Sequence, residues 1–241
     1  MIDLKSIYDV LFYTYGTQGW WPLICMQGHP GFDLRGYHPG LYQFPETEQQ
    51  RWEILCGTIL TQNTTWTNAE RALQSLLRLG IISPQEILTV STKELATLIK
   101  SSGYYNQKAE RIKKLAHFII SSQNTIPARD VLLKLKGVGP ETADSMLLYA
   151  WHQPHFVVDA YTIRLFTRIG LINKSQLPFD SQAKYQYVQN FILAHCNDFA
   201  DNKISFYSEF HSLIVMHAKQ HCSAIAECTS CPLAKHCNKV I

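Results

Sequence analysis

Four cysteines near one end of the chain have a spacing that suits ligation of a metal or a cluster. They are arranged as Cys222-x5-Cys228-x2-Cys231-x5-Cys237. Such a group of thiols in a reduced protein indicates ligands. Structural zinc sites are usually built from two separated C-x2-C pairs, whereas this chain has one such pair with a wider gap on each side. An iron–sulfur cube needs four thiolates around a larger centre, so the spacing favours a cluster over zinc, and either over uncoordinated thiols.

A glycine turn is the second candidate for chemistry. Gly137-Val138-Gly139 stands between two apolar, helix-like runs, and Pro140 follows at a position that suits the first turn of a helix. Paired glycines leave backbone N–H groups uncovered, and such groups at the start of a helix bind anions such as phosphate. The same pattern also occurs in purely structural turns.

Other polar and aromatic residues have both a structural and a functional interpretation. Asp159 follows the apolar Phe156-Val157-Val158 and precedes a helical pattern, where it is either an ordinary N-cap or a reactive carboxylate. Gln62 and Asn63 lie at a helix junction as turn formers or as side chains offered to a ligand. The pair Trp20-Trp21 packs in a core, or forms a stacking surface for a flat, cationic ligand.

The elements that must position these residues are helices. Apolar residues recur at helical spacing and no strand-helix-strand alternation is present, so we predict an all-α fold. Thr47 with Gln50, and Ser91 with Glu94, have capping-box spacing, and Ser83-Pro84 is typical of a helix start. Further helices are expected over residues 3–14, 67–79, 107–121, 181–195 and 204–219. The basic run Lys108, Arg111, Lys113 and Lys114 is expected to be a solvated face.

Composition restricts the class of protein. The 241 residues are 46% hydrophobic and 17% charged with a net charge of +3, which indicates a globular chain and permits a nucleic-acid partner. No apolar run reaches the roughly 20 residues that cross a bilayer. The N-terminal residues lack the order of a signal peptide, so we expect a cytoplasmic, nucleoid-associated protein with reduced thiols and no membrane partner.

Taken together, these motifs resemble one family. The turn Leu135-x-Gly137-Val138-Gly139-x-x-Thr142-Ala143, then Val157-Val158-Asp159 and Arg164, then the four-cysteine loop, is similar to the endonuclease III superfamily, the helix-hairpin-helix DNA glycosylases of base excision repair. The resemblance runs from about residue 47 to 237. Stretches such as Trp20-Trp21-Pro22 and Ile59-Leu60-Thr61-Gln62-Asn63-Thr64 are similar to the 3-methyladenine DNA glycosylase branch.

The resemblance implies a fold and an activity. It implies two helical lobes with a DNA-binding cleft: a six-helix barrel over residues 47–152 with the hairpin, and a second lobe of residues 1–46 plus 153–241 that ends in the cluster loop, 222–237. A monomer would act on double-stranded DNA containing a damaged base, with Asp159 as the catalytic carboxylate. Residues implied at the DNA are Gln62, Asn63, Gly137, Val138, Gly139 and Thr142; those at the base pocket are Trp20, Trp21, Trp66 and Glu141; and the [4Fe-4S] ligands are Cys222, Cys228, Cys231 and Cys237.

Two departures from the family pattern refine this expectation. Bifunctional endonuclease III has a lysine where this chain has Glu141, and glutamate has no amine with which to form a Schiff base, so we expect a monofunctional enzyme. The first cysteine gap is five residues where the family usually has six, and some of the alkylated-base branch lacks the cluster. The alternatives are a glycosylase for oxidised or mismatched bases, and a non-catalytic DNA-binding iron–sulfur protein.

Overall fold

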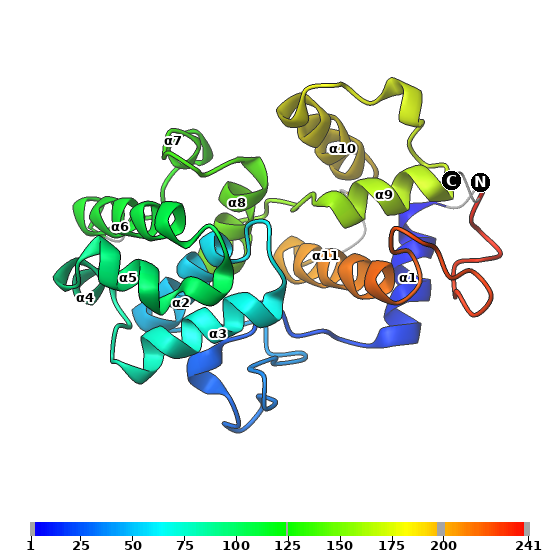
Figure 1. Cartoon of the computed structure of the whole chain (residues 1–241). Coiled ribbons are helices and arrows are strands. Elements are labelled where there is room, and N and C mark those ends of the chain that lie inside the picture. Colours follow the sequence, from blue (N-terminus) through cyan, green and yellow to red (C-terminus); the bar gives the residue numbers. More distant parts are fainter. Residues whose placement is uncertain (1–2, 124, 197–200, 239–241) are drawn as a thin grey trace. The chain divides into compact units, whose positions relative to one another are not determined.

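The computed structural model describes residues 3–123, 125–196 and 201–238. Within these ranges the regular elements are helices, which confirms the predicted all-α class. They form two compact units. We call Met1–Trp20 with Pro154–Ile241 the terminal unit, and Trp21–Gln153 the central unit (Figure 1).

The central unit contains the hairpin and the helices that support it. Its α-helices are α2 (Glu48–Leu60), α3 (Trp66–Arg78), α4 (Pro84–Thr89), α5 (Thr92–Leu98), α6 (Tyr105–Ser121), α7 (Arg129–Leu133) and α8 (Pro140–Ser145). Short 3-10 turns occur at Ile24–Met26 and Lys100–Ser102, and α8 continues into a π-helical turn over Met146–Ala150. Buried aliphatic residues of α2, α3 and α6 form much of its core.

Several of these helices begin where the sequence predicts. Both capping boxes are formed, because Thr47 accepts from Gln50 N–H and Ser91 accepts from Glu94 N–H while each partner side chain bonds back. Ser83 caps α4 ahead of Pro84. Each of these side chains satisfies a backbone N–H that has no partner within the first helical turn.

The terminal unit combines segments from both ends of the chain. It contains α1 (Leu4–Tyr15), α9 (Ala160–Ile169), α10 (Ser181–Cys196) and α11 (Lys203–Gln220), with a 3-10 turn at Lys174–Gln176. Helix α1, drawn in blue, lies beside α11, drawn in orange, and buries Leu4, Ile7 and Leu11 (Figure 1). The aromatic residues Phe156, Phe166 and Phe210 fill the core beneath Asp159 and α9.

Residues 21–46 group differently from the expected division, which placed them with the second lobe. In the structure they pack with residues 47–153. The reason is a buried carboxylate on α2: Glu53 accepts the backbone N–H groups of Ile24 and Cys25. Arg35 adds an ion pair with Glu70 of α3 at 3.0 Å. The loop therefore satisfies its buried backbone through the central unit.

No helix in the described part of the chain is long and apolar enough to cross a membrane.

Candidate active site and DNA-contacting hairpin

One glutamine holds the glycine turn in the central unit. Gln62, just beyond α2, donates from Nε2 to the carbonyl oxygen of Gly137 at 2.9 Å and to Oγ1 of Thr142 at 3.0 Å. Its Oε1 accepts from the guanidinium of Arg111 on α6 at 2.6 Å. Both ends of the amide are therefore occupied, and Gln62 links α2 and α6 to both sides of the turn.

The two glycines of the turn have different roles in its geometry. Gly137 has a φ of +89°, and a Cβ at this position would lie 2.2 Å from Nε of Arg111. Gly139 has a φ of −93° and open space around its Cα, and α8 begins directly after it at Pro140. Among the described residues, the N–H groups of both glycines have no hydrogen-bond acceptor, whereas Val138 between them is buried. Uncovered N–H groups in such a turn suit an anion.

Asn63, predicted to contact DNA, adjoins this network. Its backbone is left-handed, with a φ of +52°, and its side chain is exposed. Asparagine tolerates this conformation better than most residues, so the turn-forming role holds. Exposure leaves the amide accessible to a ligand as well.

The basic run on α6 is only in part the solvated face that its composition suggests, because Lys114 is exposed and Lys108 is buried. Lys108 is 1% exposed and donates from Nζ to the carbonyl oxygens of Leu60 and Ser102 at 2.8 and 2.6 Å. Burial, with a smaller contribution from the charge of Arg111, lowers the pKa of Lys108 to about 8. Lys113 donates to the Val90 carbonyl. These side chains tie α6 to neighbouring helix ends, because unpaired carbonyls there need donors.

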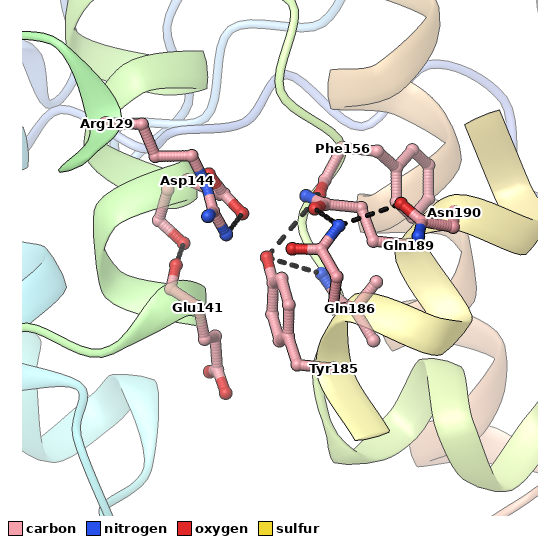
Figure 2. A network of polar contacts seen from close by, with 10 residues as sticks. Arg129, Glu141, Asp144, Phe156, Tyr185, Gln186, Gln189 and Asn190 are labelled. Atoms are coloured by element: carbon pink, nitrogen blue, oxygen red, sulfur yellow. Dashed lines mark hydrogen bonds and ion pairs between the residues drawn. The ribbon is translucent and has the colours of Figure 1, made fainter. Parts of the chain in front are cut away.

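A buried ion pair fixes the helix that follows the turn. Arg129 donates to Asp144 from Nε to Oδ1 at 2.6 Å and from Nη2 to Oδ2 at 2.9 Å, and the Asp144 side chain is fully buried. Figure 2 shows that the Glu141 carboxylate points away from this pair, while its carbonyl oxygen accepts from Ser145 at 2.7 Å. Glu141 is exposed, so its charge stays hydrated.

Asp159 caps α9 in the terminal unit, and its side chain is 13% exposed. Oδ1 accepts from Thr162 twice, from the backbone N–H at 2.7 Å and from the hydroxyl at 2.8 Å. Oδ2 lies 3.7 Å from Nε2 of His211 on α11. Burial by itself raises the pKa of Asp159, but the interactions with His211 and Thr162 outweigh burial and hold the pKa below its ordinary value. The carboxylate is therefore ionised at neutral pH.

The backbone that leads into Asp159 is clamped by α10. Gln189 donates to the Phe156 carbonyl at 2.7 Å, and the Tyr185 hydroxyl accepts from the Val158 N–H at 3.3 Å (Figure 2). Gln186 extends this network along the same helix to Asn190 at 2.8 Å. Because Tyr185 and Gln189 are buried, they restrict the segment immediately before the carboxylate.

The tryptophans predicted for the base pocket divide between the two units. Trp21 is buried in the central unit, in T-shaped contact with Trp66 at 5.6 Å and tilted against Tyr149 at 5.4 Å. Its ring also covers Gly57, whose added Cβ would lie 3.0 Å from the indole nitrogen. Trp20 belongs to the terminal unit, where its ring meets His211 edge-on at 5.5 Å. The structure thus brings Trp21 and Trp66 together and gives Trp20 a separate partner.

The four C-terminal cysteines line a single pocket in the terminal unit, together with Arg168 and His217. Arg168 donates from Nη1 to Sγ of Cys222 at 3.3 Å, and Arg164 donates to the Cys222 carbonyl at 2.7 Å. Nε2 of His217 lies 3.8 Å from Sγ of Cys231. Two arginines therefore lie where thiolates would carry negative charge, which suits an anionic cluster.

The thiols of this pocket are close enough to affect one another's ionisation. Burial, and then the neighbouring Cys228, Cys237 and Cys222, raise the pKa of Cys231. In the described residues, no three His, Cys, Asp or Glu side chains are arranged to hold a single metal ion.

Comparison with known proteins identifies the family. Residues 56–189 match the HhH-GPD superfamily of base excision DNA repair proteins, and the chain belongs to this family. A candidate DNA repair glycosylase of Methanocaldococcus jannaschii is 35% identical over 97% of this chain and 95% of its own length. Endonuclease III of Thermotoga maritima is 32% identical over 58% of this chain and 67% of its own length.

Solved structures agree with this assignment. The 3-methyladenine DNA glycosylase of H. pylori, MagIII, bound to 1,N6-ethenoadenine, has a TM-score of 0.68 and 25% identity, covering 91% of this chain and 98% of its own. A non-covalent endonuclease III–DNA complex has a TM-score of 0.64 and 26% identity, covering 78% and 83%. The suspected superfamily is therefore confirmed, with a neighbour in the 3-methyladenine branch.

Several residues of these sites were not predicted from the sequence. Arg111 was assigned to a solvated face, and Arg129 to no role. His211, Tyr185 and Gln189 come from helices far along the chain from Asp159.

Proposed function

We propose that the protein is a monofunctional DNA glycosylase that hydrolyses the N-glycosidic bond of a flipped, damaged base, with an alkylated purine such as 3-methyladenine as its substrate. The observation that carries this proposal is Asp159. It is an ionised, nearly buried carboxylate at a helix start, held by Thr162 and His211. A carboxylate in such surroundings stabilises positive charge strongly, because little water screens it.

The reaction needs little acid catalysis from the protein. An N-alkylated purine is already cationic, so its bond to the sugar is weak. As that bond breaks, positive charge develops on the sugar. Asp159 would stabilise this charge and orient or deprotonate the attacking water.

The hairpin supplies a sequence-independent hold on DNA. The N–H groups of Gly137 and Gly139 are uncovered, and a DNA phosphate is the natural acceptor. Gln62 and Thr142 keep the turn in the conformation that presents these groups. Base extrusion from the helix, which glycosylases require, would follow this anchoring step.

The aromatic cluster of the central unit supports a cationic base as ligand. Trp21, Trp66 and Tyr149 are packed ring against ring, and electron-rich rings attract cations. The similarity to MagIII, a 3-methyladenine DNA glycosylase bound to 1,N6-ethenoadenine, favours the same class of base. Glu141, exposed at the start of α8, would add an acceptor or a negative charge.

The cysteine pocket would hold a [4Fe-4S] cluster through Cys222, Cys228, Cys231 and Cys237. The bound cluster would brace the loop from Cys222 to Cys237 against α9. Arg168 and Arg164 already fasten this loop to α9 through side-chain hydrogen bonds. Iron and sulfide analysis of freshly purified protein distinguishes the cluster from zinc, and a zinc stoichiometry of one with no iron would refute it.

A panel of duplexes, each with one lesion, tests the activity. Protein is incubated with each duplex under single-turnover conditions, and heating in alkali reveals abasic sites. We expect breakage at 3-methyladenine with the natural protein and none with Asp159→Asn. Excision of only oxidised or mismatched bases would overturn the substrate assignment. DNA binding with no excision of any lesion would indicate the non-catalytic alternative.

The lack of lyase activity has its own test. Borohydride reduction traps a Schiff base as a covalent protein–DNA adduct. Because Glu141 stands at the lysine position, we expect no adduct with wild-type protein. A stable adduct would refute the monofunctional assignment.

A further inference from the structure

Asp159 has four lone-pair positions on its two oxygens, and hydrogen bonds occupy the two on Oδ1. Thr162 uses Oδ1 twice, through its N–H and its hydroxyl. Nε2 of His211 approaches Oδ2 at 3.7 Å, a distance that suits an ion pair and exceeds a direct hydrogen bond. Oδ2, beside His211, is therefore the oxygen that would meet a water molecule or the sugar.

His211 is itself held in place. It is 4% exposed, and the ring of Trp20 packs edge-on against it at 5.5 Å. The segment that carries Trp20 is fastened to the same helix. Ser208 donates to the Trp20 carbonyl at 3.3 Å, and the Glu209 carboxylate accepts from the Gln18 N–H at 2.9 Å. Ser208, Glu209 and His211, within one turn of α11, thus hold the segment that carries Trp20 beside the imidazole.

We propose that His211 is a positioning residue of the glycosylase reaction, which orients Oδ2 of Asp159 toward the reacting groups through the 3.7 Å contact while Thr162 holds Oδ1. This inference rests on the proposed function, and it extends that function to a residue on α11. The inference also gives Trp20 a role apart from base stacking, because its ring packs against the imidazole of His211 and limits its rotation beside the carboxylate. A shift of about 1 Å in a reacting group costs on the order of 10²-fold in rate.

Other titratable or charged groups near the pair are turned to different partners. Glu209 of α11 faces the N–H groups of Gln18 and Gly19. Arg164 of α9 donates to the Cys222 carbonyl, and the Tyr185 hydroxyl of α10 accepts from the Val158 N–H. Tyr8 of α1 packs against Phe206 and Phe210, and burial raises its pKa to about 12, so it stays neutral during the assay.

Replacement of His211 by leucine and by glutamine tests the inference. The readouts are the single-turnover excision rate from pH 5 to pH 9 and the affinity for duplex DNA containing an uncleavable abasic analogue. For His211→Leu we expect a rate loss on the order of 10²-fold at neutral pH with little change in affinity. The acid limb of the profile should move to higher pH, because the interactions with His211 that lower the pKa of Asp159 are lost.

His211→Gln separates positioning from folding. Its amide restores a donor but no charge, so part of the rate should return while the acid limb stays shifted. His195→Leu, the same change at an exposed histidine of α10, is the matched control and should behave as wild type.

If wild type is active and His211→Gln has the same acid limb as wild type, this inference alone is overturned, whether or not the leucine variant folds. A loss confined to DNA affinity would do the same. A folded wild type that excises no lesion would overturn the proposed function and this inference with it.

Discussion

Replacing Gly137 by alanine should destabilise the hairpin through two separable effects. The first is backbone strain, because a φ of +89° is costly for any residue with a Cβ. The second is steric, because the new Cβ would lie 2.2 Å from Nε of Arg111 and 2.5 Å from its Cδ. Arg111 must then move and release its 2.6 Å hydrogen bond to Gln62.

The magnitudes follow from these contacts. A left-handed alanine costs about 1–2 kcal/mol. Loss of a hydrogen bond to a charged group costs about 1.5–3 kcal/mol. Gly137→Ala should therefore lower the free energy of unfolding by about 2.5–5 kcal/mol in wild type, but by only about 1–2 kcal/mol in an Arg111→Ala background. The coupling energy between the two positions is expected to be about 1.5–3 kcal/mol.

Urea unfolding of the four members of this cycle, followed by tryptophan fluorescence, measures the coupling. Gly139→Ala is the matched control: its φ is −93° and no atom lies within 4 Å of an added Cβ, so its stability should change by less than about 0.5 kcal/mol. Equal losses for Gly137→Ala in both backgrounds would show that Arg111 does not press on the turn. A loss at Gly139 as large as at Gly137 would refute the conformational argument.

Further predictions concern a buried acid, the clamp on the catalytic segment and the lysine position. Burial raises the pKa of Glu53 to about 7 against an ordinary 4.5. Its contribution to the free energy of unfolding is therefore present below pH 4.5 and falls by about 3 kcal/mol as the pH rises through 7. Calorimetry should show that Glu53→Gln gains stability relative to wild type from about pH 5 to about pH 8, and a constant difference between the two proteins would contradict this. Gln189→Leu should lower the excision rate more than Gln186→Leu, because only Gln189 holds the Phe156 carbonyl; equal single-turnover rates would argue against the clamp. Glu141→Lys should introduce a borohydride-trappable adduct where wild type gives none, and absence of trapping at pH 8 in an active variant would show that this position does not reach the sugar.

Local sequence patterns predicted local structure well. The capping boxes at Thr47 and Ser91 and the proline start at Pro84 are formed as expected, because each depends on groups within four residues of one another. Asp159 as an N-cap is another such case. The family assignment succeeded for a related reason, since a hairpin motif keeps its glycines at fixed offsets.

Contacts between residues far apart in the chain could not be predicted from the sequence. Residues 21–46 were expected in the second lobe but pack with α2 and α3, because Glu53 and Glu70 offer acceptors that no local pattern reveals. The basic residues of α6 were expected in solvent, and Lys114 is exposed, yet Lys108 is buried against the Leu60 carbonyl at the end of α2. A long aliphatic side chain with one charge suits either environment, so only the packed neighbours decide.

The sequence by itself determined the helical class, the family, the turn at Gly137 and the carboxylate at Asp159, because each is encoded by residue types at short, fixed spacings. Only the tertiary structure decided which distant residues surround them: Gln62 and Arg111 on the turn, His211 beside the carboxylate, and the separate partners of Trp20 and Trp21. Burial and contacts between distant helices orient a side chain and set its charge, and these quantities arise only once the chain is packed.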